Sequence, residues 1–306
     1  MDVHSLNELQ LVTSDEKAAN PMLHKAGLAA LISLFALVGA ILIAALAFTL
    51  AGGKWFIIET PSMGQAAPVG TLVLTTPVRV ADLQKGDIIS FHPPTEPKAT
   101  YTHRVYSITN GVVLTKGDNN GRYDPWTLTQ KDLIGTSISV LPVIGWIVRS
   151  VPYLLAGFAI LFVLTRFLKR RWRASIWLTG TSLILTVTVL ILKPFTNLIL
   201  LTTSTGSAHP TATVVSTGIL PIKVTAEHGN TVHLVAGQLG QMDVSAILKA
   251  EHFYRITSSL DLPIWGWIIF WAFCLTPMLY VFLVGLPPVQ EAELIESESE
   301  NLEVLS

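Results

Sequence analysis

The sequence predicts a membrane protein with about four transmembrane helices, an extracytoplasmic β-rich domain and a second, smaller β-rich outer segment. Three observations lead to this fold class. Half of the 306 residues are hydrophobic and only 13% are charged, whereas roughly a quarter of the residues in soluble proteins are charged. The apolar residues gather into long runs with few charges. Between these runs, short β-branched stretches alternate with turn residues, which is typical of strands.

Four apolar runs are long enough to cross a bilayer, whose hydrocarbon core needs about 20 residues of helix. The shortest run is bracketed by Arg149 and Arg166, whose long side chains can reach the headgroups. The first run exceeds the apolar part of a cleaved leader, so we interpret it as a retained anchor. The predicted helices cover residues 26–50, 151–168, 174–192 and 262–286.

The charge of one short loop predicts how these helices are oriented. Residues 169–173 include four basic residues, and short basic loops stay in the cytoplasm. The N-terminal segment, 1–25, and the glutamate-rich tail, 287–306, are then cytoplasmic. Residues 54–148 and 193–261 lie outside the cytoplasm. We therefore expect a multi-pass protein of the plasma membrane, with both β-rich parts on the outer side.

The composition argues against several other classes of protein. A formal net charge of −1 provides no basic face for nucleic acid. The single cysteine, Cys274, excludes an intramolecular disulfide and a multi-cysteine metal site. His209, His228 and His233 lack the spacing of metal ligands, so we expect no metal. The predicted helices also lack the buried charges of a channel or transporter.

Strand signals occur in both outer segments. In the first segment, Asn110-Gly111 separates two β-branched runs, and Asn-Gly is the strongest short signal for a hairpin. The second segment has a turn signal at 228–230. Its alternating runs cover 211–215, 222–226 and 231–236.

Three polar patches of residues 54–148 contain the residue types of a serine hydrolase. Ser62 follows the first apolar run, His103 precedes a β-branched run, and a polar turn ends at Asp124. A neutral imidazole can accept the proton of a serine hydroxyl near neutral pH. A carboxylate can fix the tautomer of that imidazole. Each patch alone also fits an ordinary surface serine, a surface histidine or a polar loop, and the residues do not decide whether the three groups meet.

In their order along the chain, these patches resemble the motifs of type I signal peptidases. The resemblance is to the branch found in archaea, the endoplasmic reticulum and some Gram-positive bacteria, and it covers about 54–145. The motifs are Pro61-Ser62-Met63, Lys85-Gly86-Asp87-Ile88-Ile89-Ser90-Phe91, His103-Arg104-Val105, and Lys116-Gly117-Asp118-Asn119-Asn120 with Asp124.

The resemblance implies a role for each matching residue. Ser62 is the nucleophile, and His103 is the general base where the common bacterial branch has a lysine. Asp124 orients His103, and Asp118 either takes that role or organises its loop. The backbone N–H of Ser62 binds the oxyanion, with the hydroxyl of Thr60 as a second candidate donor. Three lysines outside the motif position remain as other bases: Lys85, Lys98 and Lys116.

The implied function is that of a serine endopeptidase that removes signal peptides from secreted preproteins. It would cut after small residues, of the Ala-x-Ala type, at the outer membrane surface. Its expected partners are preproteins with signal peptides, the lipid bilayer and, by association, the secretion machinery. It would need no cofactor. Two other hypotheses stay open: a peptidase dedicated to one or a few surface or fibre proteins, and a noncatalytic membrane assembly factor.

Overall fold

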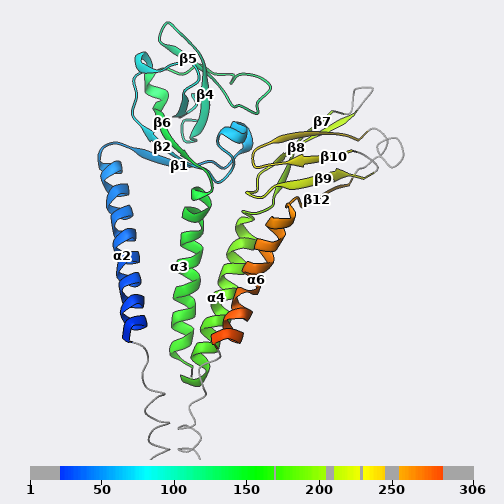
Figure 1. Cartoon of the computed structure of the whole chain (residues 1–306). Coiled ribbons are helices and arrows are strands. Elements are labelled where there is room, and N and C mark those ends of the chain that lie inside the picture. Colours follow the sequence, from blue (N-terminus) through cyan, green and yellow to red (C-terminus); the bar gives the residue numbers. More distant parts are fainter. Residues whose placement is uncertain (1–20, 169, 205–209, 228–229, 245–254, 285–306) are drawn as a thin grey trace, which may run out of the picture. The chain divides into compact units, whose positions relative to one another are not determined.

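A computed structural model describes residues 21–168, 170–204, 210–227, 230–244 and 255–284. The chain divides into two compact units, Met1–Leu192 and Lys193–Ser306 (Figure 1). Residues 1–20 of the predicted N-terminal segment, Lys169 of the basic loop and the whole acidic tail lie outside the described residues.

Four long helices are present among the described residues. Three of them are long and apolar enough to cross a membrane, through Leu28–Leu50, Ile144–Arg166 and Ser175–Leu192. The last helix coincides with the fourth predicted span, and its place in the membrane stays a prediction. The helices are α2 (Pro21–Leu50), α3 (Ile144–Arg166), α4 (Arg170–Leu192) and α6 (Ile264–Val284).

Helix α3 begins at Ile144 and not at residue 151, where the sequence predicted its start. Its first turns are held by the β-rich domain. Trp146 is buried, and Arg149 forms an ion pair with Glu59 at 3.4 Å. The sequence placed the start of this helix after Arg149, because a charged residue was expected at the edge of the membrane. The helix begins earlier because its first turns pack against the β-rich domain.

The β-rich domain of the first unit is a six-stranded antiparallel sheet with the order β1-β2-β6-β3-β4-β5. Its inward side chains form two apolar clusters, one around Phe91 and Leu128 and one around Met63 and Val73. The strands are β1 (Lys54–Ile57), β2 (Leu72–Thr76), β3 (Ile88–Phe91), β4 (Tyr101–Thr109), β5 (Val112–Lys116) and β6 (Leu133–Leu141).

The hairpin predicted at Asn110-Gly111 is confirmed. Strands β4 and β5 pair antiparallel, with Thr109 opposite Val112. Both turn residues have positive φ, 49° at Asn110 and 78° at Gly111, as a two-residue type I′ turn requires. This turn fixes the register of β4, the strand that carries His103.

The junction of α3 with the sheet depends on a close contact at Gly70. The indole Nε1 of Trp146 donates a hydrogen bond to the carbonyl of Val69 at 3.1 Å. Gly70 has a φ of 83°, and a Cβ at this position would lie 1.9 Å from Nε1 of Trp146. The tryptophan therefore fills the space that a side chain at residue 70 would occupy, and it ties α3 to the domain.

Gly70→Ala is expected to destabilise the protein by about 2–4 kcal/mol, since it combines backbone strain with overpacking. Thermal unfolding in detergent measures the effect. Gly86→Ala is the matched control, because Gly86 also has a positive φ, 102°, but has nothing within 4 Å of its Cβ position. Equal melting temperatures for the two variants would show that the contact with Trp146 does not matter.

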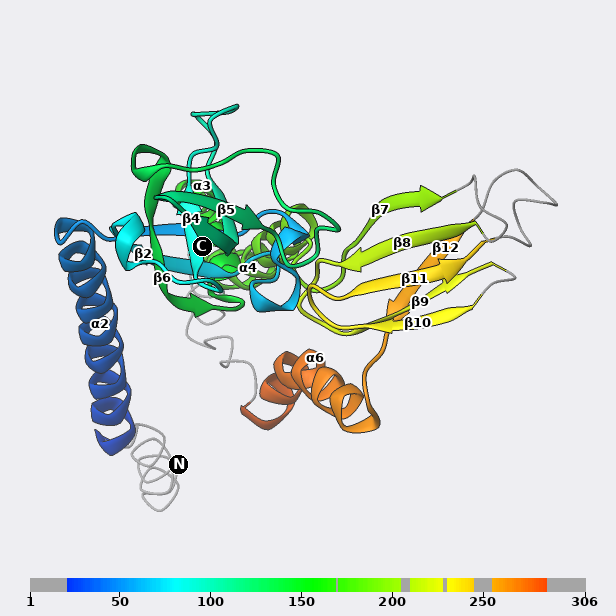
Figure 2. The ribbon, with the colours of Figure 1, turned by 90° about the horizontal axis from the view of Figure 1, so that it is seen from above.

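The strands of the second unit form two three-stranded antiparallel sheets, with the orders β10-β9-β12 and β11-β8-β7 (Figure 2). Side chains from both sheets share one apolar core, which includes Val214, Val224 and Met242. We call this part the β-sandwich. Its strands are β7 (Leu198–Ser204), β8 (Thr211–Ser216), β9 (Ile222–Ala226), β10 (Thr231–Leu234), β11 (Leu239–Asp243) and β12 (Ile256–Leu260).

The three strand runs predicted in residues 193–261 correspond to β8, β9 and β10, and β7, β11 and β12 complete the sheets. Of the three histidines considered as ligands, His209 and His228 lie outside the described residues. His233 accompanies Asp261, with Nδ1 and Oδ2 2.6 Å apart. Within the described part of the chain, no group of three or more His, Cys, Asp or Glu side chains could hold a metal ion.

Candidate active site

Ser62 lies in a short 3₁₀ turn, η1 (Pro61–Ala66), that follows the first strand. Pro61 occupies the first position of the turn, where its missing N–H costs nothing. Thr60 before it has an extended backbone. The hydroxyls of Thr60 and Ser62 are 3.2 Å apart. The half-buried Ser62 side chain is thus held at the start of a turn, and Met63 beside it is fully buried.

His103 lies on β4, directly opposite Ile89 of β3. Only 4% of its surface is exposed. Phe91 and Tyr101 contact its imidazole with their rings, at centroid distances of 6.1 and 5.8 Å. The aromatic rings pack against the imidazole, and its two nitrogens make the polar contacts of this buried side chain.

The two nitrogens of His103 join Ser62 to Asp124. Nδ1 lies 2.7 Å from Oδ2 of Asp124, and Nε2 lies 3.1 Å from Oγ of Ser62. An ionised carboxylate only accepts hydrogen bonds, so Nδ1 carries the proton. In the neutral ring, Nε2 is then the acceptor for the hydroxyl of Ser62. Because the hydroxyl of Ser62 donates its only proton to Nε2 of His103, Oγ of Ser62 must accept the hydrogen bond that it shares with Thr60.

Asp124 is held by Thr115 of β5. The hydroxyl of Thr115 donates to Oδ2 of Asp124 at 2.6 Å, and the backbone N–H of Asp124 donates to the carbonyl of Thr115 at 2.8 Å. Thr115 is fully buried, and Asp124 is only 5% exposed. Thr115 is on β5, which pairs with β4, the strand of His103. The two hydrogen bonds between Thr115 and Asp124 therefore hold the carboxylate at a fixed distance from the imidazole.

Thr115→Val is expected to lower kcat by about 10- to 100-fold, the value of one hydrogen bond to a charged group. Valine keeps the shape of the buried side chain, so KM should change little, while loss of the buried hydrogen bond lowers the melting temperature by a few degrees. The exposed Thr127 provides the control variant, Thr127→Val. A kcat equal to that of the control would show that Thr115 does not position Asp124.

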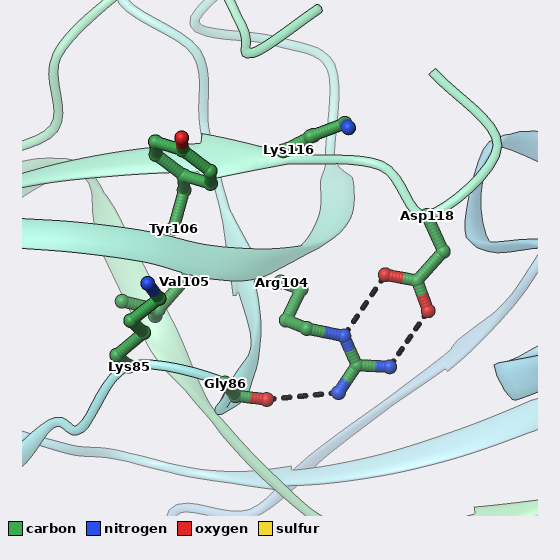
Figure 3. Close-up of a pocket in the computed structure, with 7 residues that line it drawn as sticks. All are labelled: Lys85, Gly86, Arg104, Val105, Tyr106, Lys116 and Asp118. Carbon is green, nitrogen blue, oxygen red and sulfur yellow. Dashed lines mark hydrogen bonds and ion pairs between the residues drawn. The ribbon is translucent and has the colours of Figure 1, made fainter. Parts of the chain in front are cut away.

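Asp118 bonds to Arg104 (Figure 3). Nε and Nη2 of Arg104 donate to the two carboxylate oxygens of Asp118 at 2.9 and 2.7 Å, and Nη1 donates to the carbonyl of Gly86 at 2.9 Å. The hydrogen bonds to Asp118 raise the pKa of Arg104 above its ordinary value. Neighbouring residues of a strand point to opposite faces, so Arg104 faces away from the side on which His103 meets Ser62.

Asn119, the next residue, fastens the turn that carries Ser62. Its backbone N–H donates to the carbonyl of Ser62 at 2.8 Å, and its side-chain amide donates to the carbonyl of Pro61 at 2.8 Å. A Cβ at Gly117 would lie 2.8 Å from the carbonyl of Ser62, so glycine permits this close approach. Arg104, Asp118 and Asn119 therefore brace β4 against the Ser62 turn.

A cleft of about 330 Å³ ends at Ser62 and His103. One wall is the segment from Phe56 to Thr60, and the other is Thr100 together with the beginning of β4, from Tyr101 to His103. Burial, followed by the charge of nearby Glu96, raises the pKa of Tyr101 in this wall, so its phenol stays neutral. The cleft is lined by apolar residues, such as Phe56 and Ile57, and by polar ones that include Thr60 and Ser62.

The residues singled out in the sequence fall into two groups. Ser62, His103 and Asp124 meet, with Thr60 beside Ser62, whereas Asp118 bonds to Arg104. Sequence reasoning gave no role to Thr115. Thr115 lies two residues after Val113 and therefore on the same, buried face of β5. A threonine at a buried position indicates a hydrogen-bond partner, because a buried hydroxyl needs one.

The three lysines considered as other bases lie apart from this arrangement. Lys85 and Lys116 line the pocket of Figure 3, together with Arg104, and Lys98 is exposed. Lys85 lies over the ring of Tyr106, with Nζ 5.5 Å from its centroid.

A hydroxyl, an imidazole and a carboxylate linked in this order are the arrangement found in serine hydrolases. Residues 30–119 of the chain match the family described as signal peptidase, peptidase S26. The match covers less than a third of the chain and includes Ser62 and His103. No curated protein matches the chain.

Proposed function

We propose that this chain is a membrane-bound signal peptidase, a serine endopeptidase that removes leaders from secreted preproteins after small residues. The observation that carries the proposal is the hydrogen-bonded series Ser62–His103–Asp124 at the end of the cleft. The family match and the apolar helices support the same function. The intact series also argues against a noncatalytic assembly factor.

In the proposed reaction, Oγ of Ser62 attacks the carbonyl carbon of the scissile bond while its proton moves to Nε2 of His103. Asp124 stabilises the imidazolium that forms. His103 then gives the proton to the leaving amine, and the mature protein departs. The leader remains as an ester on Ser62. Water, deprotonated by His103, hydrolyses this ester and restores the hydroxyl.

The oxyanion of each tetrahedral intermediate needs hydrogen-bond donors at the position where the charge develops. We assign the backbone N–H of Ser62 to this role, since the first N–H groups of a helical turn lack partners within it. Thr60 is the second donor. Its hydroxyl already contacts Oγ of Ser62 and can turn toward the oxyanion once that oxygen is acylated.

The backbone of the cleft wall supports binding of an extended peptide. Ile58 donates its N–H to Thr71 and accepts from the N–H of Gly70. Its neighbours Ile57 and Glu59 direct their N–H and C=O groups to the other side, because such groups alternate along a strand. A leader in extended form can therefore pair with this edge and present its carbonyl to Ser62.

The proposed setting is a plasma membrane with multiple helices through it and the β-rich domain on the outer side, as the basic residues of 169–173 predict. Residues 170–173, predicted as a loop, form the first turn of α4 in the structure, and their charge still favours the cytoplasmic side. A leader that is itself a membrane helix then meets the cleft where it leaves the bilayer. The proposed partners are preproteins and the bilayer, together with secretion machinery that delivers the preproteins.

The experiment is cleavage of several preproteins with Ala-x-Ala sites by the purified full chain in detergent micelles, read by the intact mass of the products. Ser62→Ala provides the control for copurified proteases. We expect cuts directly after the second alanine, which are lost when that alanine is replaced by phenylalanine. Cleavage of one preprotein among many would favour the dedicated peptidase. No cleavage by a folded wild-type protein would contradict both forms of the proposal.

A further inference from the structure

One end of the β-sandwich carries the chain connections to α4 and α6. Phe195 stands three residues after the end of α4, and Asp261 stands three residues before the start of α6. The N–H of Leu220 donates to the carbonyl of Phe195 at 2.9 Å, and that of Asp261 donates to the carbonyl of Pro221 at 3.0 Å. The β8–β9 connection therefore lies at the same end as both helix junctions.

This end exposes apolar side chains. Phe195 and Val235 are each 47% exposed, and Ile219 and Leu220 are half-buried. Val235 reaches this end because its neighbour Leu234 pairs with Ile222, directly after the β8–β9 connection. We call Phe195, Ile219, Leu220 and Val235 the apolar end. Clustered exposed apolar residues of this kind mark interaction sites on proteins.

At the opposite end of the β-sandwich, the residues that the structure describes have the reverse character. Their exposed side chains are polar or charged, and they stand where β9, β10, β11 and β12 begin or end away from the helices. The exposed residues there include Glu227, Asn230, Asp243 and Arg255.

The covalent connection to α4 limits how far the apolar end can be from a bilayer. Three residues of extended chain span at most about 11 Å, and α4 is long and apolar enough to cross the membrane. Apolar side chains of interfacial segments reach about 5–10 Å into the boundary between headgroups and acyl chains. Phe195, and Leu220 bonded to it, are therefore within reach of that boundary.

We propose that the apolar end is a membrane-contacting surface, whose partner is the lipid interface of the bilayer that α4 crosses. Lys193, exposed at the same junction, faces headgroups that can be anionic. Asp261 at this end is hydrogen-bonded to His233, with Oδ2 2.6 Å from Nδ1. The contact holds the β-sandwich by this end against the membrane. It does not depend on peptidase activity.

The test uses single-cysteine variants of the full chain in lipid nanodiscs of phosphatidylcholine and phosphatidylglycerol. Cys274→Ser removes the native thiol, and Phe195→Cys or Leu220→Cys carries an environment-sensitive fluorophore. Glu227→Cys, at the opposite end, is the matched control. Phospholipids with a nitroxide near the headgroup should quench most of the emission at residues 195 and 220 and little of it at residue 227.

Two outcomes would overturn the proposal. Equal and weak quenching at all three positions would place the apolar end in water. Blue-shifted emission at residues 195 and 220 that lipid nitroxides do not quench would mean that protein, and not lipid, covers them. Melting temperatures of the unlabelled variants identify any that fail to fold, and Val235→Cys then replaces a failed one.

Discussion

His103→Ala is expected to lower kcat for leader cleavage by about 10⁵-fold or more, as loss of the general base does in serine proteases. Nε2 of His103 lies 3.1 Å from Oγ of Ser62, and without it the hydroxyl has no acceptor for its proton. KM should change little, because the peptide binds along the cleft and not to the imidazole. Single-turnover cleavage of a preprotein in micelles measures the effect.

The matched control for this prediction is Lys98→Ala. Lys98 was considered as a base in the sequence and is exposed in the structure, so its replacement should leave kcat unchanged. Retained activity in His103→Ala, with loss in a lysine variant, would contradict the assignment of the base.

Asp124→Asn is expected to lower kcat by about 10⁴-fold, the effect of the equivalent change in a serine protease triad. The amide can donate to Nδ1 of His103, and this would favour the tautomer with the proton on Nε2. Ser62 would then face a donor where it needs an acceptor. Folding should be preserved, since the amide has the size of the carboxylate and the hydroxyl of Thr115 can turn to accept from the amide nitrogen that takes the place of Oδ2.

Asp118→Asn separates the roles of the two aspartates. Asp118 bonds to Arg104 and not to the imidazole, so this change should lower the melting temperature and reduce kcat far less than Asp124→Asn does. If Asp118→Asn had the larger effect on kcat, Asp118 would be the residue that orients His103.

The sequence was sufficient for those parts of the fold that depend on local signals. The Asn110-Gly111 turn and the paired strands around it follow from backbone preference, and the apolar runs follow from the thickness of a bilayer. The start of α3 could not be predicted in this way. It depends on Trp146 filling the space beside Gly70, a contact between residues far apart in the sequence.

The candidate site could be predicted only as a set of residues. Ser62, His103 and two aspartates were recognisable, but Asp118 and Asp124 lie in one polar loop and both have suitable chemistry. The pairing of β4 with β5 separates them, because Arg104 and His103 point to opposite faces of one strand. Arg104 bonds to Asp118, and Thr115 holds Asp124 under His103.

The most direct test of the central claim, that Ser62 is the nucleophile of a signal peptidase, is a search for the leader ester. Wild-type protein is mixed with a preprotein, quenched in acid and digested for peptide mass spectrometry, with Ser62→Ala in parallel. We expect the mass of the leader on the peptide that contains Ser62, and no mature protein from the variant. A leader ester on another residue, or release of mature protein by Ser62→Ala at the wild-type rate, would contradict the account.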